Sequence, residues 1–175
     1  VLASTSPRRK ELLQQIGVKF TQLSIDINED VIDAESAAQY VLRLAKEKAA
    51  AGFELLTAAE QSTRVVLAAD TTVVCEGNIL AKPESLEHSK EILRQLSGRE
   101  HLVMSAIGMH SQDKAQQKIV TTKVKFRNIS DAEIETYWQS GEPQDKAGSY
   151  GIQGLGAVFV ESITGSYSNV VGLPL

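Results

Sequence analysis

Hydrophobic and polar residues follow two rhythms along this chain, and segments of the two kinds alternate. Apolar residues at helical spacing, or helix-capping signals, predict helices over residues 7–16, 36–56, 85–96 and 130–138. Apolar runs or period-two alternation predict strands over residues 1–3, 65–74, 79–81, 101–110, 119–127 and 157–163, with 18–27 extended. Because helices and strands interleave throughout, we expect an α/β fold with a mixed sheet flanked by helices.

Composition and charge limit the class of protein. The 175 residues include 18 Lys+Arg and 22 Asp+Glu, for a net charge of -4. This length suits a single domain over residues 1–175, and the acidic balance argues against nucleic-acid or membrane partners. The one cysteine, Cys75, cannot form an intrachain disulfide, and no apolar run approaches the length of a membrane span. We therefore expect a cytoplasmic protein.

One predicted buried strand contains a carboxylate. Asp70 interrupts the apolar run over residues 65–74, where a charge is costly unless it is paired, hydrogen-bonded or bound to a metal. Residues that end a buried run often project into a cleft at the edge of a sheet. We therefore favour a functional role for Asp70 over a purely structural ion pair. A turn at Gly77 brings Lys82 back towards this strand, but the sequence does not define which face it takes.

Several cations stand where local patterns disfavour them. Arg8, Arg9 and Lys10 open the first helix, although the helix dipole disfavours positive charge there by about 0.3–1 kcal/mol per residue. With the free backbone N–H groups they would form an anion site, and extension into solvent is an equal alternative. Lys48 lies on the apolar stripe of the second helix. It must either extend to water, the commoner outcome at a helix end, or meet an anion.

Two loops add polar groups. Glu29 lies in an acidic stretch with Asp26 and Asp30, which alone indicates a solvated loop. The glycine-rich segment 148–156 permits close approach of a ligand to its backbone, and Gln153 within it offers both a donor and an acceptor. Its glycine spacing does not fit a dinucleotide or P-loop motif. One cysteine and three scattered histidines provide no zinc-ligand spacing.

Cations, one or two carboxylates and a glycine loop are together typical of a site for a phosphorylated substrate and a divalent metal. Arginine and lysine hold phosphate oxygens, while carboxylates hold Mg²⁺ or orient a water molecule. The residue patterns alone define the function no further than this class.

A series of short motifs runs along the whole chain. They are LASTSPRR (2–9), RLAKEKA (43–49), ADT (69–71), KP (82–83), DKAGSYGIQG (145–154) and VGLP (171–174). In sequence and order they resemble the motifs of the Maf family of nucleotide pyrophosphatases. This resemblance implies a fold like that of the inosine triphosphate pyrophosphatases, elongated and with a cleft between two lobes. We also expect the family's C-terminal helix to be missing after Pro174, together with part of a possible homodimer contact.

The resemblance implies a cytoplasmic enzyme that uses Mg²⁺ or Mn²⁺ to cleave nucleoside triphosphates to the monophosphate and pyrophosphate. Asp70 matches the family's catalytic proton acceptor and, with Glu29, would hold the metal. Lys82 is also expected to take part in catalysis. The positions that match polar residues of the family's cleft are Ser6, Arg9, Glu29, Lys48 and Lys82.

Three positions match those associated with base choice in the family. Arg8, Thr71 and Gln153 resemble the subgroup that acts on dTTP and UTP, whereas the subgroup for 7-methyl-GTP carries Trp, Gln and Glu. We therefore predict hydrolysis of dTTP and UTP, which would remove excess or non-standard nucleotides. One alternative is a different base choice, such as CTP or modified nucleotides. The other is a binding protein that inhibits septum formation, a process to which the family has been linked.

Overall fold

The computed structural model describes residues 1–175, and the chain within it forms two compact units. Unit 1 comprises Val1–Asp70, Ser105–Val120 and Gly172–Leu175, whereas unit 2 comprises Thr71–Met104 and Thr121–Val171. The chain passes from one unit to the other within three strands and near its C-terminal end. The single domain expected from the sequence over residues 1–175 stays a prediction, because this division into two units does not test it.

Seven strands form a mixed sheet in the order β2-β1-β3-β5-β6-β7, with β4 beside β3. β1 pairs in parallel with β2 and β3, whereas β4 and β7 pair antiparallel with β3 and β6. The predicted α/β class with a mixed sheet is therefore confirmed. The strands are β1 (Leu2–Ala3), β2 (Gln22–Leu23), β3 (Val66–Cys75), β4 (Asn78–Leu80), β5 (Glu100–His110), β6 (Ala115–Phe126) and β7 (Val160–Thr164).

Six α-helices and three short 3₁₀ helices complete the structure. The four predicted helices are confirmed as α1, α2, α4 and α5, whereas α3 and α6 were too short to be predicted from apolar spacing. None of the helices combines the length and the apolar character that a membrane span needs. The helices are α1 (Pro7–Gln15), α2 (Ala37–Glu54), α3 (Ala58–Gln61), α4 (Leu86–Leu96), α5 (Asp131–Gln139), α6 (Tyr167–Val171), η1 (Glu142–Asp145), η2 (Ala147–Ser149) and η3 (Leu155–Phe159).

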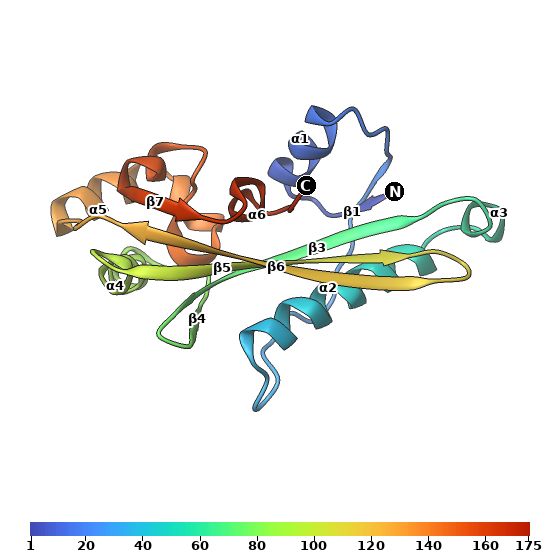
Figure 1. The fold of residues 1–175 in the computed structure, drawn as a ribbon, viewed down its shortest axis with the longest axis horizontal. Helices are drawn as coiled ribbons and strands as arrows, with labels where there is room; N and C mark the ends of the chain where they lie inside the picture. Colours follow the sequence, from blue (N-terminus) through green and yellow to red (C-terminus); the bar gives the residue numbers. More distant parts are fainter. The chain divides into compact units, whose positions relative to one another are not determined.

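In unit 1, α2 is the longest helix and contributes much of the core. Ser36 and Gln39 form a capping box that starts the helix, and Leu44 and Ala45 are fully buried. Figure 1 shows α2 lying beside the turn end of the β5–β6 hairpin. The backbones approach closely there, because a Cβ atom at Gly108 of β5 would overlap the carbonyl oxygen of Ala45. This packing fixes the face of α2 that points to the sheet.

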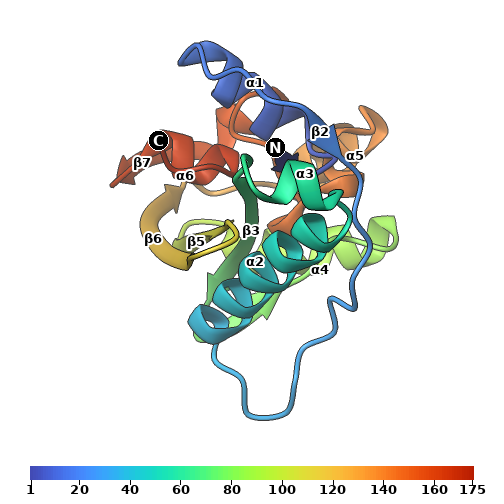
Figure 2. The same ribbon diagram turned by 90° about the vertical axis from the view of Figure 1, so that its right-hand side faces the viewer.

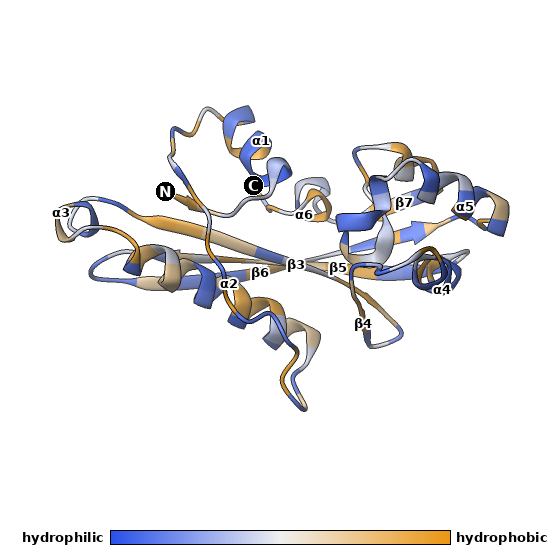
Figure 3. Cartoon of the chain, turned by 180° about the vertical axis from the view of Figure 1, so that it is seen from behind, coloured by the Kyte–Doolittle hydropathy of each residue, from blue (hydrophilic) through white to orange (hydrophobic).

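Two other features of unit 1 place polar groups near α2. The connection from β2 to α2, residues 24–36, runs as an open loop ahead of the helix (Figure 2). β3 begins with an apolar run in which Val66, Ala68 and Ala69 are fully buried. The hydrophobic colouring of this strand is interrupted part way along it (Figure 3). In the sequence, Asp70 directly follows the apolar run. The strand and the loop therefore bring acidic residues towards the same helix.

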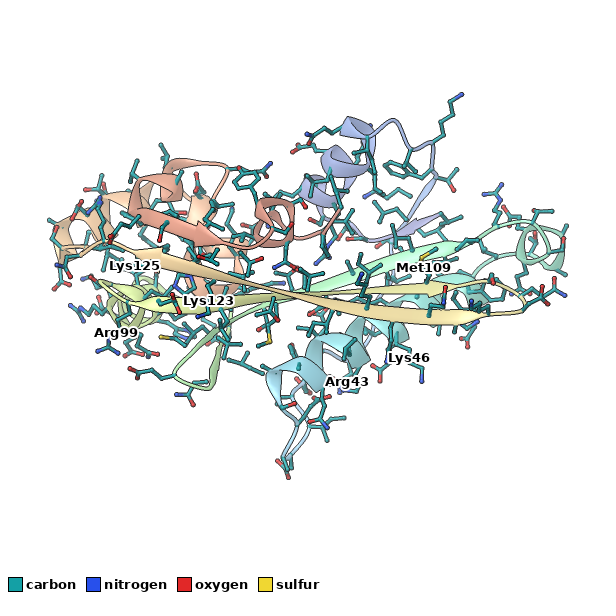
Figure 4. All side chains as sticks on the ribbon, viewed as in Figure 1. Arg43, Lys46, Arg99, Met109, Lys123 and Lys125 are labelled. Atoms are coloured by element: carbon teal, nitrogen blue, oxygen red, sulfur yellow. The ribbon has the colours of Figure 1, made fainter.

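In unit 2, β6 shows the predicted period-two alternation. Thr122, Val124 and Phe126 are fully buried, whereas Lys123 and Lys125 are exposed on this strand (Figure 4). The half-exposed strand expected from the sequence is therefore confirmed.

An aromatic cluster forms the core of unit 2. The ring of Phe126 meets Tyr150 and His101 edge to face, with centroids 4.6 and 4.8 Å apart. His101 Nε2 and the Tyr150 hydroxyl lie 2.8 Å apart in a hydrogen bond. Burial lowers the pKa of His101 to about 4, so its imidazole is neutral at pH 7.

The predicted strand over residues 157–163 is wrong in its first part. Residues Leu155–Phe159 form the 3₁₀ helix η3, and β7 begins only at Val160. The N–H of Ala157 donates to the carbonyl of Gly154 at 3.1 Å, a turn that an extended chain cannot make. Within the segment 18–27, which was expected to be extended, Gln22–Leu23 form β2 and pair with β1.

Candidate active site

Asp70 lies at the end of the apolar run of β3 and is buried, with its side chain 10% exposed. Lys48 of α2 donates to Asp70 Oδ1 across 2.7 Å. α2 directs Lys48 towards the strand because this lysine shares the helix face of the buried Leu44. The carboxylate in the strand is thus paired, as its burial requires.

Lys48 also reaches a second carboxylate, since its Nζ lies 2.6 Å from Glu29 Oε1. The lysine side chain is only 12% exposed, so it does not extend into water, the commoner outcome for a lysine on an apolar stripe. It meets anions instead, and both belong to the protein. One ammonium therefore bridges a buried and a half-exposed carboxylate.

Glu29 is held over Lys48 by two residues of α2 that the sequence patterns did not identify. Tyr40 donates its hydroxyl to the carbonyl of Glu29 at 3.0 Å. Arg43, labelled on α2 in Figure 4, donates to the carbonyl of Asp30 at 2.9 Å. It also binds both carboxylate oxygens of Glu35, at 2.7 and 2.9 Å. These bonds explain how a residue in a loop can be placed accurately.

Burial raises the pKa values of two groups in this cluster. Burial raises the pKa of the Asp70 carboxyl above its ordinary value, and the positive charges of Lys48 and Arg9 offset this effect only in part. Burial, with the charges of Asp70 and Glu29, raises the pKa of Tyr40 to about 12. Asp70 therefore binds protons more strongly than an exposed aspartate does, which suits a group that accepts a proton near neutral pH.

At the start of α1, Arg9 turns inward. It donates from Nε to the carbonyl of Gly172 at 2.9 Å and from Nη1 to Ser4 Oγ at 3.2 Å. Burial lowers the pKa of Arg9, and the negative charges of Asp70 and Glu29 offset part of this effect. Arg9 therefore interacts with the two carboxylates that Lys48 bridges. The alternative that Arg9 extends into solvent is therefore wrong.

Ser6 and Arg8 share the N-terminal turn of α1 with Arg9. Ser6 is the N-cap residue, but its hydroxyl makes no capping bond to the helix. Arg8 is half-buried, and its positive charge acts on Arg9. This turn therefore carries a hydroxyl and two guanidinium groups at the N-terminal end of a helix, a combination suited to an anion.

Unit 2 holds the remaining predicted residues. Thr71 is half-buried in β3, whereas Lys82 after β4 and Gln153 in the glycine-rich loop are exposed. The N–H of Gly148 donates to the carbonyl of Ala81 at 3.2 Å. This bond attaches the start of the glycine-rich loop to the segment that carries Lys82.

Most glycines of this loop approach the protein itself rather than open space. A Cβ atom at Gly148 would lie 2.7 Å from the side chain of Val73, and one at Gly156 would lie 2.7 Å from the Tyr137 hydroxyl. At Gly154 it would overlap the carboxylate of Glu142. The sequence suggested that these glycines allow a ligand to approach, but their packing shows close contacts with the protein itself.

The donor atoms at Asp70 and Glu29 suit a divalent metal in type. Their oxygens lie 2.7 and 2.6 Å from one shared cation, Lys48 Nζ, and Mg²⁺ is often bound by one or two carboxylates and substrate phosphates. No group of three or more His, Cys, Asp or Glu residues converges as a metal cage. The residues thus fit a metal whose coordination substrate oxygens complete.

Comparison with known proteins agrees with the motifs. The family model described as Maf-like protein matches residues 1–175. The dTTP/UTP pyrophosphatase of Vibrio parahaemolyticus serotype O3:K6 is 54% identical, and the alignment covers 100% of this chain and 90% of the relative. The dTTP/UTP pyrophosphatases of Vibrio vulnificus strain YJ016 and Colwellia psychrerythraea strain 34H are 53% and 51% identical, over 100% of this chain and 92% and 82% of the relatives. The resemblance seen in the motifs is confirmed.

Proposed function

Since this chain belongs to the Maf family, we propose that it is a nucleoside triphosphate pyrophosphatase that acts on dTTP and UTP. It hydrolyses the bond between the α- and β-phosphates and releases the monophosphate and pyrophosphate. The observation that carries the proposal is the buried Asp70 carboxylate, held by Lys48 and accompanied by Glu29. The enzyme would remove excess or non-standard pyrimidine nucleotides, and it would work in the cytoplasm, with a homodimer as a possible assembly.

Asp70 is the proton acceptor in this mechanism. Because burial raises its pKa, the carboxylate takes a proton from a water molecule more readily than an exposed aspartate would. The oxygen of that water attacks the α-phosphorus, and the bond to the bridging oxygen of the β-phosphate breaks. Lys48 orients the carboxylate and keeps it ionised until the proton arrives.

The cations hold the triphosphate and oppose the charge that develops on pyrophosphate. Arg9, Ser6 and Lys82 supply guanidinium, hydroxyl and ammonium donors for phosphate oxygens. Such fixed positive groups stabilise the transition state because they require no reorganisation during the reaction. Arg8, Thr71 and Gln153 contact the base and select uracil or thymine.

Mg²⁺ or Mn²⁺ is the cofactor in this proposal, and Asp70 and Glu29 are the residues that would hold it. Bound there, the metal would neutralise phosphate charge. The two carboxylates lie close together because both are ion-paired with Lys48.

A nucleotide panel tests the proposal. Wild-type protein with Mg²⁺ or Mn²⁺ is incubated with dTTP, UTP, CTP, GTP and 7-methyl-GTP, and monophosphate and pyrophosphate are measured. We expect turnover of dTTP and UTP and its loss in Asp70→Asn, while Asp131→Asn, a change in a surface ion pair with Arg94, retains it. Unchanged turnover in Asp70→Asn, preference for a purine, or release of orthophosphate and diphosphate would contradict the proposal.

A further inference from the structure

The loop that carries Gln153 is fastened to a carboxylate. Glu142, in η1, accepts hydrogen bonds from the backbone N–H groups of Leu155 at 2.7 Å and Gly156 at 3.1 Å. These two residues follow Gln153 by two and three positions. The C-terminal side of the loop therefore depends on one side chain that lies outside it.

The N-terminal side of the same loop is fastened by a tyrosine. The hydroxyl of Tyr137, in α5, accepts from the N–H of Gly151 at 3.0 Å and donates to Glu142 Oε1 at 2.7 Å. Tyr137 and Glu142 thus form a connected pair that reaches both ends of the segment Gly151–Gly156. Gln153 lies between the two attachment points and is exposed.

The backbone of the loop is shaped to fit this pair. A Cβ atom at Gly154 would overlap the Glu142 carboxylate, and one at Gly156 would lie 2.7 Å from the Tyr137 hydroxyl. Only a residue without a side chain allows such approach. The two glycines that follow Gln153 are therefore explained by contact with Glu142 and Tyr137, and not by a ligand.

Glu142 remains ionised in this setting. Burial raises the pKa of its carboxyl, but the hydrogen bonds from Tyr137, Gly156 and Leu155 outweigh burial and leave the pKa below its ordinary value. Charge-assisted hydrogen bonds of this kind are stronger than neutral ones. The loop is thus held firmly at neutral pH.

From this arrangement we infer that Glu142 is a positioning residue for base selection, which acts by fixing the loop that presents Gln153. The inference rests on the proposed function, in which Gln153 contacts the base. Uracil and thymine offer an acceptor at O4 where cytosine offers an amine. A glutamine amide has a donor end and an acceptor end and can satisfy either pattern if it is free to turn. Discrimination therefore requires the loop to hold the amide in one place and one orientation.

The substitution Glu142→Gln tests this at nearly constant shape. The amide keeps one acceptor oxygen for Tyr137 and Gly156, but its NH₂ group then faces the N–H of Leu155, so that attachment is lost. We expect the ratio of kcat/KM for dTTP to that for CTP to fall about tenfold, as the loss of one charge-assisted hydrogen bond would produce. Tyr137→Phe removes the acceptor for Gly151 and should lower the same ratio.

Glu133→Gln is the matched control. Glu133 also accepts from a backbone N–H, that of Ser130, and from Arg127, both within unit 2, but these contacts do not involve the glycine-rich loop. Circular dichroism and thermal unfolding of each variant identify those that fold. We expect the control to keep the wild-type ratio even if it lowers stability.

The outcomes separate the inference from the proposed function. A lowered ratio in Glu142→Gln and Tyr137→Phe, but not in Glu133→Gln, supports the inference. Equal loss of activity on dTTP, UTP and CTP, or an unchanged ratio in a folded Glu142→Gln, overturns it while the proposed function stands. A wild-type protein that releases no pyrophosphate from dTTP or UTP overturns both.

Discussion

The ion pair between Lys48 and Asp70 allows a test of the site that does not depend on catalysis. The substitution Lys48→Met removes the ammonium and retains a flexible apolar chain. At the observed separation of 2.7 Å, an effective dielectric constant of about 20 gives an attraction of about 6 kcal/mol. Desolvation of both groups opposes this attraction, and breaking a buried pair typically costs about 3–5 kcal/mol. Because Arg9 still offsets part of the Asp70 charge, we expect the free energy of unfolding to fall by about 3 kcal/mol, at the lower end of this range.

A double-mutant cycle in urea measures this value. The free energy of unfolding is compared among wild type, Lys48→Met, Asp70→Asn and the double variant. Once the buried charge is gone, the missing ammonium matters less, so the double variant should be more stable than Lys48→Met and the coupling should be about 2–3 kcal/mol. Lys46→Met, a change at an exposed lysine of the same helix (Figure 4), should alter stability by less than about 0.5 kcal/mol.

The loss of stability in Lys48→Met should depend on pH in a predictable direction. Removal of Lys48 takes away an influence that lowers the pKa of Asp70, so the folded variant binds a proton more strongly than its unfolded form. Its deficit relative to wild type should therefore be smallest in acid and grow as the pH rises through the folded-state pKa. A deficit equal to that of Lys46→Met, or additive effects in the double variant, would refute the pairing.

Two further outcomes are expected. Arg43→Met removes the hydrogen bond that holds the loop of Glu29. The kcat for dTTP should fall about tenfold or more with little change in KM, because a misplaced group near the reaction lowers turnover. An unchanged kcat would contradict the role of Arg43 in positioning this loop. The lowered pKa of His101, about 4 against an ordinary value of 6.5, means that the unfolded chain gains a proton which the folded chain does not. As the pH is lowered from 6.5 to 4, the free energy of unfolding should thus fall by about 1.4 kcal/mol per pH unit. Urea unfolding of His101→Phe should lack this slope. A slope retained in that variant would contradict burial of a neutral imidazole.

The elements with local signals were predictable, because the signals act within a few residues. Ser36 and Ser130 each open a helix through a capping box, and the alternation around Lys123 and Lys125 fixes which face of β6 is buried. The 3₁₀ helix η3 was not predictable in this way. Its first two residues, Leu155 and Gly156, donate hydrogen bonds to Glu142, which lies thirteen and fourteen residues earlier in the chain. No local pattern contains these bonds.

The residues of the candidate site also differ in whether a local sequence pattern reveals them. Asp70 and Lys48 could be singled out because each breaks the apolar pattern of its own element. Their pairing, however, arises from the packing of α2 against the sheet. Glu29 carries no such signal, since an acidic residue in an acidic loop is ordinary, and only the resemblance to the Maf family identified it. The residues that hold it, Tyr40 and Arg43, act through backbone carbonyls, which no sequence pattern records.

The energetics of β3 favour a functional reason for Asp70. A buried ion pair is on average no more stable than apolar residues of similar volume, and replacing one can raise stability by about 1–4 kcal/mol. An apolar residue at position 70 would simply continue the apolar run Val66–Ala69, in which Val66, Ala68 and Ala69 are fully buried. Lys48 would then not be needed on α2 as an ion-pair partner. The raised pKa of Asp70 has the same meaning, because it shows that Lys48 and Arg9 do not fully offset the cost of burial. The net charge of -4 for the whole chain does not reveal this local cluster of opposite charges. The fold bears an energetic cost at Asp70 that chemistry on a phosphorylated substrate explains and packing does not.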